Sequence, residues 1–379
     1  MRNSNFLLRE WASTPYCGLA KLKGSIAQSV EQRIENPRVG GSNPSRATFL
    51  PLIYRLQQTP GKVTKVVNAP HKSSWNRANA VYGGCIMTLP GTVRLTHPFT
   101  DYPVLEIAHP TAQARIALHG AHLLEWTPAG QKPVLYLSPQ SSYEVGKAIR
   151  GGVPVCWPWF GAHASNPALP SHGFVRNHFW QLDSASEDAS GVLLKFSFRD
   201  DEETRALWPH AFQLTLECFI GNTLSLALTM ENTGETDFTV TDALHTYFTV
   251  GDISQVSIEG LDGADYLDTR GGQRQPHLQS GDINFAGEVD SLYRTSAPTT
   301  IHDAAWQRVI TVKPEGSHTT VVWNPWKEKA ARLTDLPDES YHDFVCVETA
   351  NAWEDILTLA PGATHRLATH LSCAETLAA

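Results

Sequence analysis

Four segments of the sequence concentrate ionisable, polar and aromatic residues where the alternation of apolar and polar residues breaks down. They are RGGVPVCWPWFG (150–161), SHGFVRN (171–177), DALHTYF (242–248) and DFVCVETAN (343–351). Together they offer arginine for binding an anion, and histidine and carboxylate for moving protons. These residue types therefore favour proton transfer on an anionic small molecule.

The first two segments contain groups that suit a phosphate. Arg150 precedes paired glycines and several aromatic residues, and a guanidinium forms a planar fork for phosphate where glycine permits close backbone approach. This pattern predicts an anion clamp beside an aromatic wall for a sugar, although for the aromatics alone core tryptophans at a tight turn are favoured. His172 and Arg176 are four residues apart around Gly173 and could direct two donors at one ligand. A lone histidine is more often structural, so this segment alone leaves both interpretations open.

The last two segments each contain one group that can exchange a proton. His245 interrupts a strand-like stretch, and imidazole titrates near neutrality, so it could act as an acid. Glu348 ends a hydrophobic strand, where partial burial would raise its pKa towards the range of a useful base. For an isolated glutamate, a strand-end carboxylate bonded to nearby amides is the more common situation.

Composition excludes several classes of protein. No run of eighteen apolar residues appears, so we expect no membrane span. The formal net charge of -8 argues against nucleic-acid binding, and the six cysteines form no CxxC pair, which argues against a zinc site or a disulfide framework. No GxGxxG or Walker-type loop indicates a nucleotide cofactor. We expect a cytoplasmic protein with reduced thiols.

The first 86 residues differ from the rest in charge. They hold twelve Lys/Arg and three Glu, whereas the remainder holds 18 basic and 35 acidic residues. An organelle transit peptide and a flexible tail with its own partner are two interpretations. A third is favoured, because GSIAQSVEQRIENPRVGGSNPSRAT (24–48) resembles the peptide produced when a bacterial tRNA gene is translated. We therefore expect residues 1–86 to be a disordered or non-native leader before a true start at Met87.

From residue 91 the dominant pattern is the period-two alternation of β-strands. Residues 213–219 and 223–230 alternate on either side of Gly221-Asn222, which predicts a hairpin with one apolar face. Helical character is limited to 201–208. Further strand-like runs are 103–109, 113–119, 133–137, 192–198, 237–250, 254–259, 307–313, 319–323, 343–348 and 364–371. This pattern predicts an all-β antiparallel sandwich or barrel, in one domain over 87–379.

Five blocks of the sequence resemble one family when taken in order. RGGVPVCWPWFG, HGFVRN, ALHTYF, VVWNPW and FVCVETA are similar to the pattern of the glucose-6-phosphate 1-epimerase group (hexose-6-phosphate mutarotases) of the aldose 1-epimerase superfamily, across residues 98–372. Five blocks in order are a specific match, although each alone is weak. The resemblance implies a large antiparallel β-sandwich of the galactose mutarotase type, with few short helices and an open cleft.

The resemblance also implies roles for individual residues. His245 would be the general acid and Glu348 the general base, while Arg150 and Arg176 would bind the phosphate. Asp290 would bond sugar hydroxyls.

His172 would contact the substrate at the same site, as would Ser171, which stands where some relatives have glutamine. Ser291 is a second departure, because arginine is common there. Neither departure affects the proposed catalytic pair.

We therefore expect a monomeric isomerase that interconverts the α and β anomers of a hexose 6-phosphate, with a sugar phosphate as its partner and no nucleic acid, membrane, metal or cofactor. Two alternatives remain: an aldose 1-epimerase for unphosphorylated sugars, and a non-catalytic carbohydrate-binding sandwich. The presence of both Arg150 and Arg176 argues against the first alternative, because an unphosphorylated sugar has no anionic group for them to bind. The second alternative requires no acid and base that converge on one ligand. His245 and Glu348 must face one sugar-sized cleft if the enzyme interpretation is right.

Overall fold

The computed structural model describes residues 79–82, 85–99, 101–270 and 275–376. The predicted leader, residues 1–86, falls almost wholly outside these residues. At its end, β1 (Asn79–Tyr82) pairs antiparallel with β2 (Cys85–Thr88), so the predicted start at Met87 lies within β2. The described residues belong to one compact unit.

The described strands pair antiparallel throughout and form two large sheets. The nine-stranded sheet has the order β18 (Ile283–Asn284), β15 (Val256–Glu259), β20 (Thr299–Asp303), β21 (Arg308–Glu315), β25 (Thr364–Glu375), β11 (Thr223–Asn232), β10 (Phe212–Gly221), β9 (Gly191–Arg199), β8 (Gln181–Asp188). The eight-stranded sheet has the order β17 (Gln275–Leu278), β16 (Asp265–Asp268), β19 (Val289–Arg294), β22 (Thr319–Asn324), β23 (Phe344–Asn351), β13 (Asp242–Leu244), β7 (Val155–Cys156), and β14 (Tyr247–Thr249) also pairs with β23.

The smaller elements complete the fold. A four-stranded sheet has the order β3 (Val93–Phe99), β4 (Tyr102–His109), β5 (Ala112–Ala117), β6 (His122–Pro128), and β12 (Phe238–Val240) pairs with β24 (Leu357–Leu359). The α-helices of the described residues are α1 (Glu202–Leu207) and α2 (Trp326–Ala330). No helix in this part of the chain is long and apolar enough to cross a membrane.

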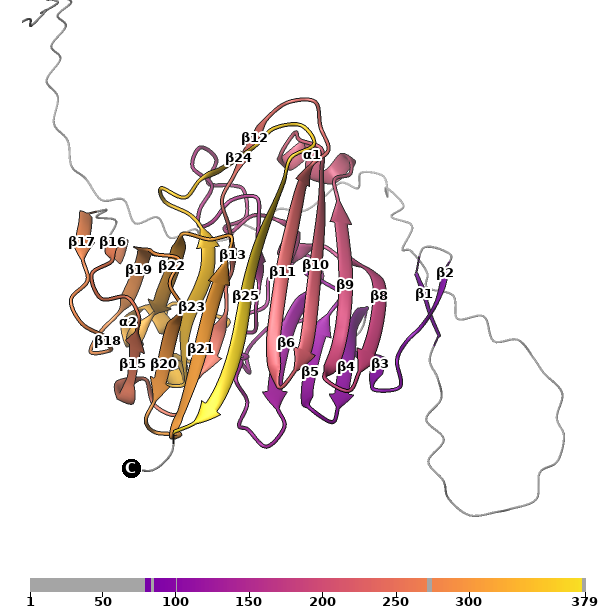
Figure 1. The fold of residues 1–379 in the computed structure, drawn as a ribbon. Helices are drawn as coiled ribbons and strands as arrows, with labels where there is room; N and C mark the ends of the chain where they lie inside the picture. Colours follow the sequence, from indigo (N-terminus) through magenta and orange to yellow (C-terminus); the bar gives the residue numbers. More distant parts are fainter. Residues whose placement is uncertain (1–78, 83–84, 100, 271–274, 377–379) are drawn as a thin grey trace, which may run out of the picture. The chain divides into compact units, whose positions relative to one another are not determined.

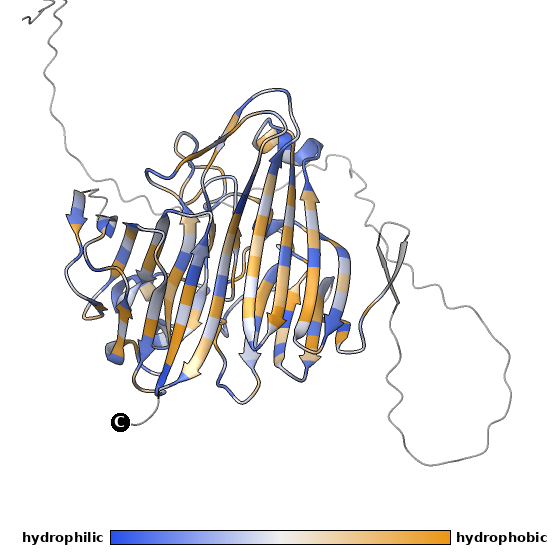
Figure 2. Ribbon diagram, in the orientation of Figure 1, coloured by the Kyte–Doolittle hydropathy of each residue, from blue (hydrophilic) through white to orange (hydrophobic). Residues whose placement is uncertain are grey.

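Alternating side chains explain how the sheets stack. Along β10 every second residue is buried, and Leu216 pairs with Leu228 of β11, which confirms the predicted hairpin. Figure 2 shows the same alternation as bands of opposite hydropathy along the long strands. Each fully buried leucine contributes about 1.5–3 kcal/mol of burial free energy. The apolar faces therefore drive the sheets together.

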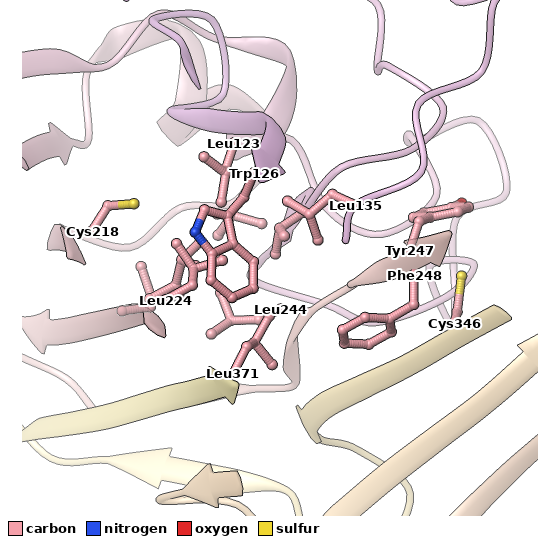
Figure 3. Packing of buried hydrophobic residues seen from close by; sticks show 14 of the residues in the cluster. Leu123, Trp126, Leu135, Cys218, Leu224, Leu244, Tyr247, Phe248, Cys346 and Leu371 are labelled. Atoms are coloured by element: carbon pink, nitrogen blue, oxygen red, sulfur yellow. The ribbon is translucent and has the colours of Figure 1, made fainter. Parts of the chain in front are cut away.

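The nine-stranded sheet forms one layer of a sandwich, and the other two sheets lie against it (Figure 1). β23 packs on β25 and β21, while β4 and β5 pack on β9 and β10. Trp126, Leu224, Leu244 and Leu371 bring side chains of all three sheets into one core (Figure 3). The prediction of a large antiparallel β-sandwich with few short helices is confirmed.

Two predicted strands differ from the structure. The run 133–137 makes only isolated bridges, such as Leu135 with Phe248, instead of a strand. The run 237–250 is divided into β12, which pairs with β24, and β13 and β14, which both pair with β23. Helix α1 lies within the predicted range 201–208, and Asp201 caps it through the Thr204 amide.

Candidate active site

Strand β23 carries the carboxylate of the site. All eight of its residues are buried, since the strand is central in its sheet and covered on both faces. Period-two alternation places Cys346 and Glu348 on the same face, opposite Val345 and Val347. Glu348 is only 1% exposed. A carboxyl held in this way is isolated from bulk water.

The interruption between β13 and β14 presents the imidazole. The backbone amide of His245 donates to Pro154 O at 3.0 Å, and that of Tyr247 donates to Gly152 O at 3.0 Å. These bonds follow the register in which β13 pairs with β7. β13 and β14 also pair with β23 in one register, Leu244 with Thr349 and Tyr247 with Cys346, which places His245 opposite Glu348. His245 Nδ1 lies 3.3 Å from Glu348 Oε1.

Aromatic rings hold the imidazole in position. The ring of Tyr247 stacks on that of His245 at 4.8 Å between centroids and an interplanar angle of 8°, and Trp323 meets it edge-on at 6.2 Å. Tyr247 and Cys346 are seen together in Figure 3. This packing orients Nδ1 towards Glu348 without a formal hydrogen bond, since neither Nδ1 nor Glu348 Oε2 has a partner among the described residues.

The pair is perturbed in opposite directions. Burial, reinforced by the negative charge of Asp290, raises the pKa of Glu348 well above its ordinary value. Burial, His172 and the arginines hold the pKa of His245 well below its ordinary value. Both shifts favour placing a proton that the two groups exchange on Glu348 rather than on His245.

Arg150 is held on two sides. Its Nε donates to Asp335 Oδ1 at 3.1 Å, and its Nη2 forms an ion pair with Asp335 Oδ2 at 3.1 Å. Its Nη1 donates to the Tyr247 hydroxyl at 3.1 Å. The neighbouring Gly151 and Gly152 lie against the backbone of residues 136–137 and 123–124, so they pack on protein and not on a ligand as the pattern predicted. Asp335 offsets the charge of Arg150.

Arg176, in contrast, has no carboxylate partner among the described residues. It lies in the turn Val175–Asn177, and its Nη2 donates to Ser171 O at 2.7 Å. Its Nε is buried and has no hydrogen-bond partner there. A half-buried guanidinium with unused donors and no counter-ion suits an anion.

His172 has a strained backbone conformation. Its φ is +62°, a region that costs a non-glycine residue about 1–3 kcal/mol and is concentrated at functional sites. Its Nδ1 accepts from the Gly161 amide at 3.3 Å, and burial lowers its pKa to about 3. The ring is therefore neutral and carries its proton on Nε2, a donor for a neutral oxygen.

Gly173 provides a test of how this segment is held. Its φ is +73°, and a Cβ there would collide with the carbonyl oxygen of Trp157. We expect Gly173→Ala to destabilise the protein by about 1–3 kcal/mol more than Gly263→Ala, because only Gly173 adds overpacking to the left-handed strain. Gly263 has a φ of +75° and open space around it. Urea unfolding of both variants measures the difference, and equal losses would contradict the packing role of Gly173.

One cavity of about 190 Å³ brings most of the predicted residues together. Its lining includes five of the predicted residues, namely Arg150, Ser171, His172, Arg176 and His245. Residues from the first three segments singled out in the sequence thus meet at one place.

Two predicted residues do not line this cavity. Glu348 contacts His245 but has almost no exposed surface. Asp290 is on β19, where its Oδ2 accepts from Lys329 Nζ at 2.8 Å, and Lys329 also bonds Glu288 at 2.9 Å. The negative charge of Asp290 therefore acts on the pair by raising the pKa of Glu348.

The tryptophans of the first segment belong to the core. Trp157 is fully buried and packs against Phe212 at 4.5 Å between ring centroids. Trp159 is 8% exposed and donates to Pro170 O at 2.9 Å. The favoured interpretation of these aromatics as core residues is confirmed, and they form no sugar-stacking wall.

Three residues that line the cavity or contact the predicted site residues are not predicted from the sequence, namely Tyr247, Asp335 and Lys329. Tyr247 lies inside the DALHTYF segment, and its spacing of two from His245 was an available signal. No sequence signal indicates Asp335 or Lys329. Lys329 lies in α2 and Asp335 in the turn that follows it, and neither segment has a recognisable motif. Asp335 lines the cavity, and Lys329 holds Asp290.

One group of side chains in the described part of the chain has the composition of a metal site. Ligand atoms of His245, Cys346 and Glu348 all lie within 4.8 Å of one another. Nitrogen, sulfur and oxygen donors suit zinc. Arg150 and Arg176 exert their positive charge on His245, which opposes binding of a cation.

The fold and the site together define a β-sandwich of the galactose mutarotase type, with a buried imidazole–carboxyl pair beside an arginine-bearing cavity. The family model described as "Aldose 1-epimerase" matches residues 103–372, and the chain belongs to this family.

Similar proteins support this assignment. The chain is 44% identical over 255 residues to a protein of Escherichia coli (strain K12) named "Putative glucose-6-phosphate 1-epimerase", covering 67% of this chain and 85% of that protein. A protein of the same name from Cenchrus ciliaris is 38% identical, covering 66% of this chain and 78% of that protein. The crystal structure of "a putative mutarotase (YeaD)" from Salmonella typhimurium superposes with a TM-score of 0.71 at 37% identity, covering 76% of this chain and 96% of that chain.

Proposed function

We propose that this protein is a hexose-6-phosphate mutarotase that interconverts the α and β anomers of glucose 6-phosphate or a close relative. The observation that carries the proposal is the contact of His245 with Glu348 at 3.3 Å, with His245 lining the same cavity as Arg176. The names of the relatives support this substrate class. His245 and Glu348 would transfer protons at one end of the site, and Arg176, which has no carboxylate partner among the described residues, would bind an anion at the other.

Ring opening requires one proton to leave and another to arrive. The Glu348 carboxylate takes the proton of the C1 hydroxyl, the C1–O bond to the ring oxygen breaks as the aldehyde forms, and the His245 imidazolium protonates the departing ring oxygen. After rotation about C1–C2, the same two transfers run in reverse and close the ring on the other face. No proton is gained or lost over the cycle, and each positioned transfer contributes about 10²–10⁴ in rate.

The remaining groups would hold the sugar in register. Arg176 would bind the phosphate with its unused donors, and Arg150 would contribute the donors that Asp335 and Tyr247 leave free. His172 would donate from Nε2 to a sugar oxygen. Binding energy from the distant phosphate positions the reacting end of the sugar.

Arg176→Ala tests this assignment. Charge-assisted hydrogen bonds contribute about 1.5–3 kcal/mol each, so kcat/KM for glucose 6-phosphate should fall about 10- to 100-fold, while that for glucose stays within about threefold. Arg199→Ala, an exposed arginine of β9, is the matched control. Arg176 is a cleaner target than Arg150, whose removal would leave Asp335 without its partner.

NMR exchange rates with the two sugars measure the discrimination. Equal losses on glucose and glucose 6-phosphate in Arg176→Ala would favour an aldose 1-epimerase for unphosphorylated sugars. Binding of sugar without any acceleration of exchange by the unmodified protein would favour the carbohydrate-binding module.

A further inference from the structure

Direct contacts connect the anion-binding end of the cavity to the acid–base pair. Arg150 donates to the Tyr247 hydroxyl at 3.1 Å, and the Tyr247 ring lies parallel to that of His245 at 4.8 Å. Arg176 and His245 line the same cavity. An anion bound to Arg176 would therefore share this cavity with the imidazole.

The pair is also oriented relative to the cavity. His245 lines it, whereas Glu348 does not and is 1% exposed. Moving one proton from Glu348 to His245 therefore places positive charge on the group that lines the cavity and leaves negative charge on the buried group. Coulomb attraction to a dianion in the cavity favours this transfer, and the low-dielectric surroundings strengthen it.

The reaction needs the two proton arrangements at different moments. A closed ring is opened by a carboxylate and an imidazolium, whereas the open aldehyde is closed again by a carboxylic acid and a neutral imidazole. Burial and the positive charges of the two arginines on His245 favour the second arrangement.

The titratable side chains around the His245 imidazole determine how readily it is protonated. The groups that exert charge on the imidazole or lie in contact with it are Arg150, Arg176, His172, Tyr247, Cys346 and Glu348. In the described residues only the two arginines are cationic among these, and both oppose the imidazolium. A dianion bound to them cancels that opposition without any change of fold.

We propose that a phosphate-type dianion in the Arg176–Arg150 subsite activates the enzyme by drawing the shared proton from Glu348 onto His245. The substrate's phosphate is then an activator as well as an anchor. A free dianion that is not attached to the sugar should activate the anomerisation of an unphosphorylated hexose. This inference rests on the proposed function.

The test uses phosphite dianion, which can occupy a phosphate subsite, together with glucose and the full-length protein. The exchange rate of glucose anomers is measured by NMR with increasing phosphite, and the rate that phosphite alone produces without protein is subtracted. Potassium chloride of equal ionic strength is the salt control. We expect saturable acceleration of at least tenfold in kcat/KM for glucose, with no comparable effect of chloride.

Two variants separate a specific subsite from a general salt effect. Arg176→Ala should lose most of the acceleration, and Arg199→Ala should retain it. In the unmodified protein, saturating phosphite should also move the ¹⁵N resonances of one buried histidine towards those of imidazolium, and His245→Ala should lack that signal.

The outcomes distinguish this inference from the proposed function. Rapid exchange of glucose 6-phosphate with no acceleration of glucose by phosphite would overturn the activation and leave the mutarotase proposal standing. Acceleration that persists in Arg176→Ala would also overturn it, because the anion would then act elsewhere. Absence of enzymatic exchange with glucose 6-phosphate would instead refute the proposed function.

Discussion

Replacing Glu348 with glutamine is expected to lower kcat for the anomer exchange of glucose 6-phosphate by about 10²–10⁴-fold. The amide keeps the shape of the side chain at its position 3.3 Å from His245 Nδ1, but it cannot accept the proton of the C1 hydroxyl. NMR exchange spectroscopy measures the rate at saturating substrate. KM should change less than kcat, since the proton transfer to Glu348 is completed only in the transition state.

The same variant should fold at least as well as the unmodified protein at neutral and alkaline pH. Burial raises the pKa of Glu348 above 4.5, so the folded state retains a proton that the unfolded state has lost. Stability therefore falls as pH rises from about 4.5 towards the raised pKa, and glutamine removes this loss. Thermal unfolding at pH 5 and pH 8 checks the sign. A midpoint lower than that of the unmodified protein at pH 8 would contradict the burial argument, and near-normal exchange would contradict the base role.

Replacing His245 with alanine is expected to lower kcat by a similar 10²–10⁴-fold, because the ring oxygen loses its acid. The variant leaves an imidazole-sized space against the ring of Tyr247, which stacks on His245 at 4.8 Å. Added imidazole should therefore restore part of the exchange rate.

Glu348→Gln is the control for that rescue, since imidazole cannot replace a carboxylate and the space is still filled. The double variant should be little slower than either single variant, because the two groups act as one unit. Full additivity, or equal rescue of both variants by imidazole, would show that the groups do not exchange one proton.

Much of this site could be predicted from the sequence. Alternation along 213–219 and 223–230 predicted a hairpin with one apolar face, which the pairing of Leu216 with Leu228 confirms. The breaks in alternation were equally informative, because His245 stands where the strand 237–250 is interrupted. Arg150, His172, Arg176 and His245 all line one cavity.

The remaining features depend on contacts between distant segments. Asp335 neutralises the charge of Arg150 although the two residues are 185 positions apart in the sequence, and no local sequence pattern predicts this contact. Lys329 meets Asp290 only because α2 folds back towards β19. The run 133–137 has strand-like composition but finds only isolated bridge partners, since tertiary pairing overrides intrinsic preference.

The central claim is that a phosphorylated hexose is anomerised by the pair His245–Glu348. The most direct measurement is NMR exchange spectroscopy of the C1 protons of α- and β-glucose 6-phosphate with the unmodified protein and with Glu348→Gln, at equal protein concentration. The predicted result is exchange far above the spontaneous rate with the unmodified protein and a return almost to that rate with Glu348→Gln. Exchange at the spontaneous rate with both proteins, or equal acceleration by both, would contradict the account.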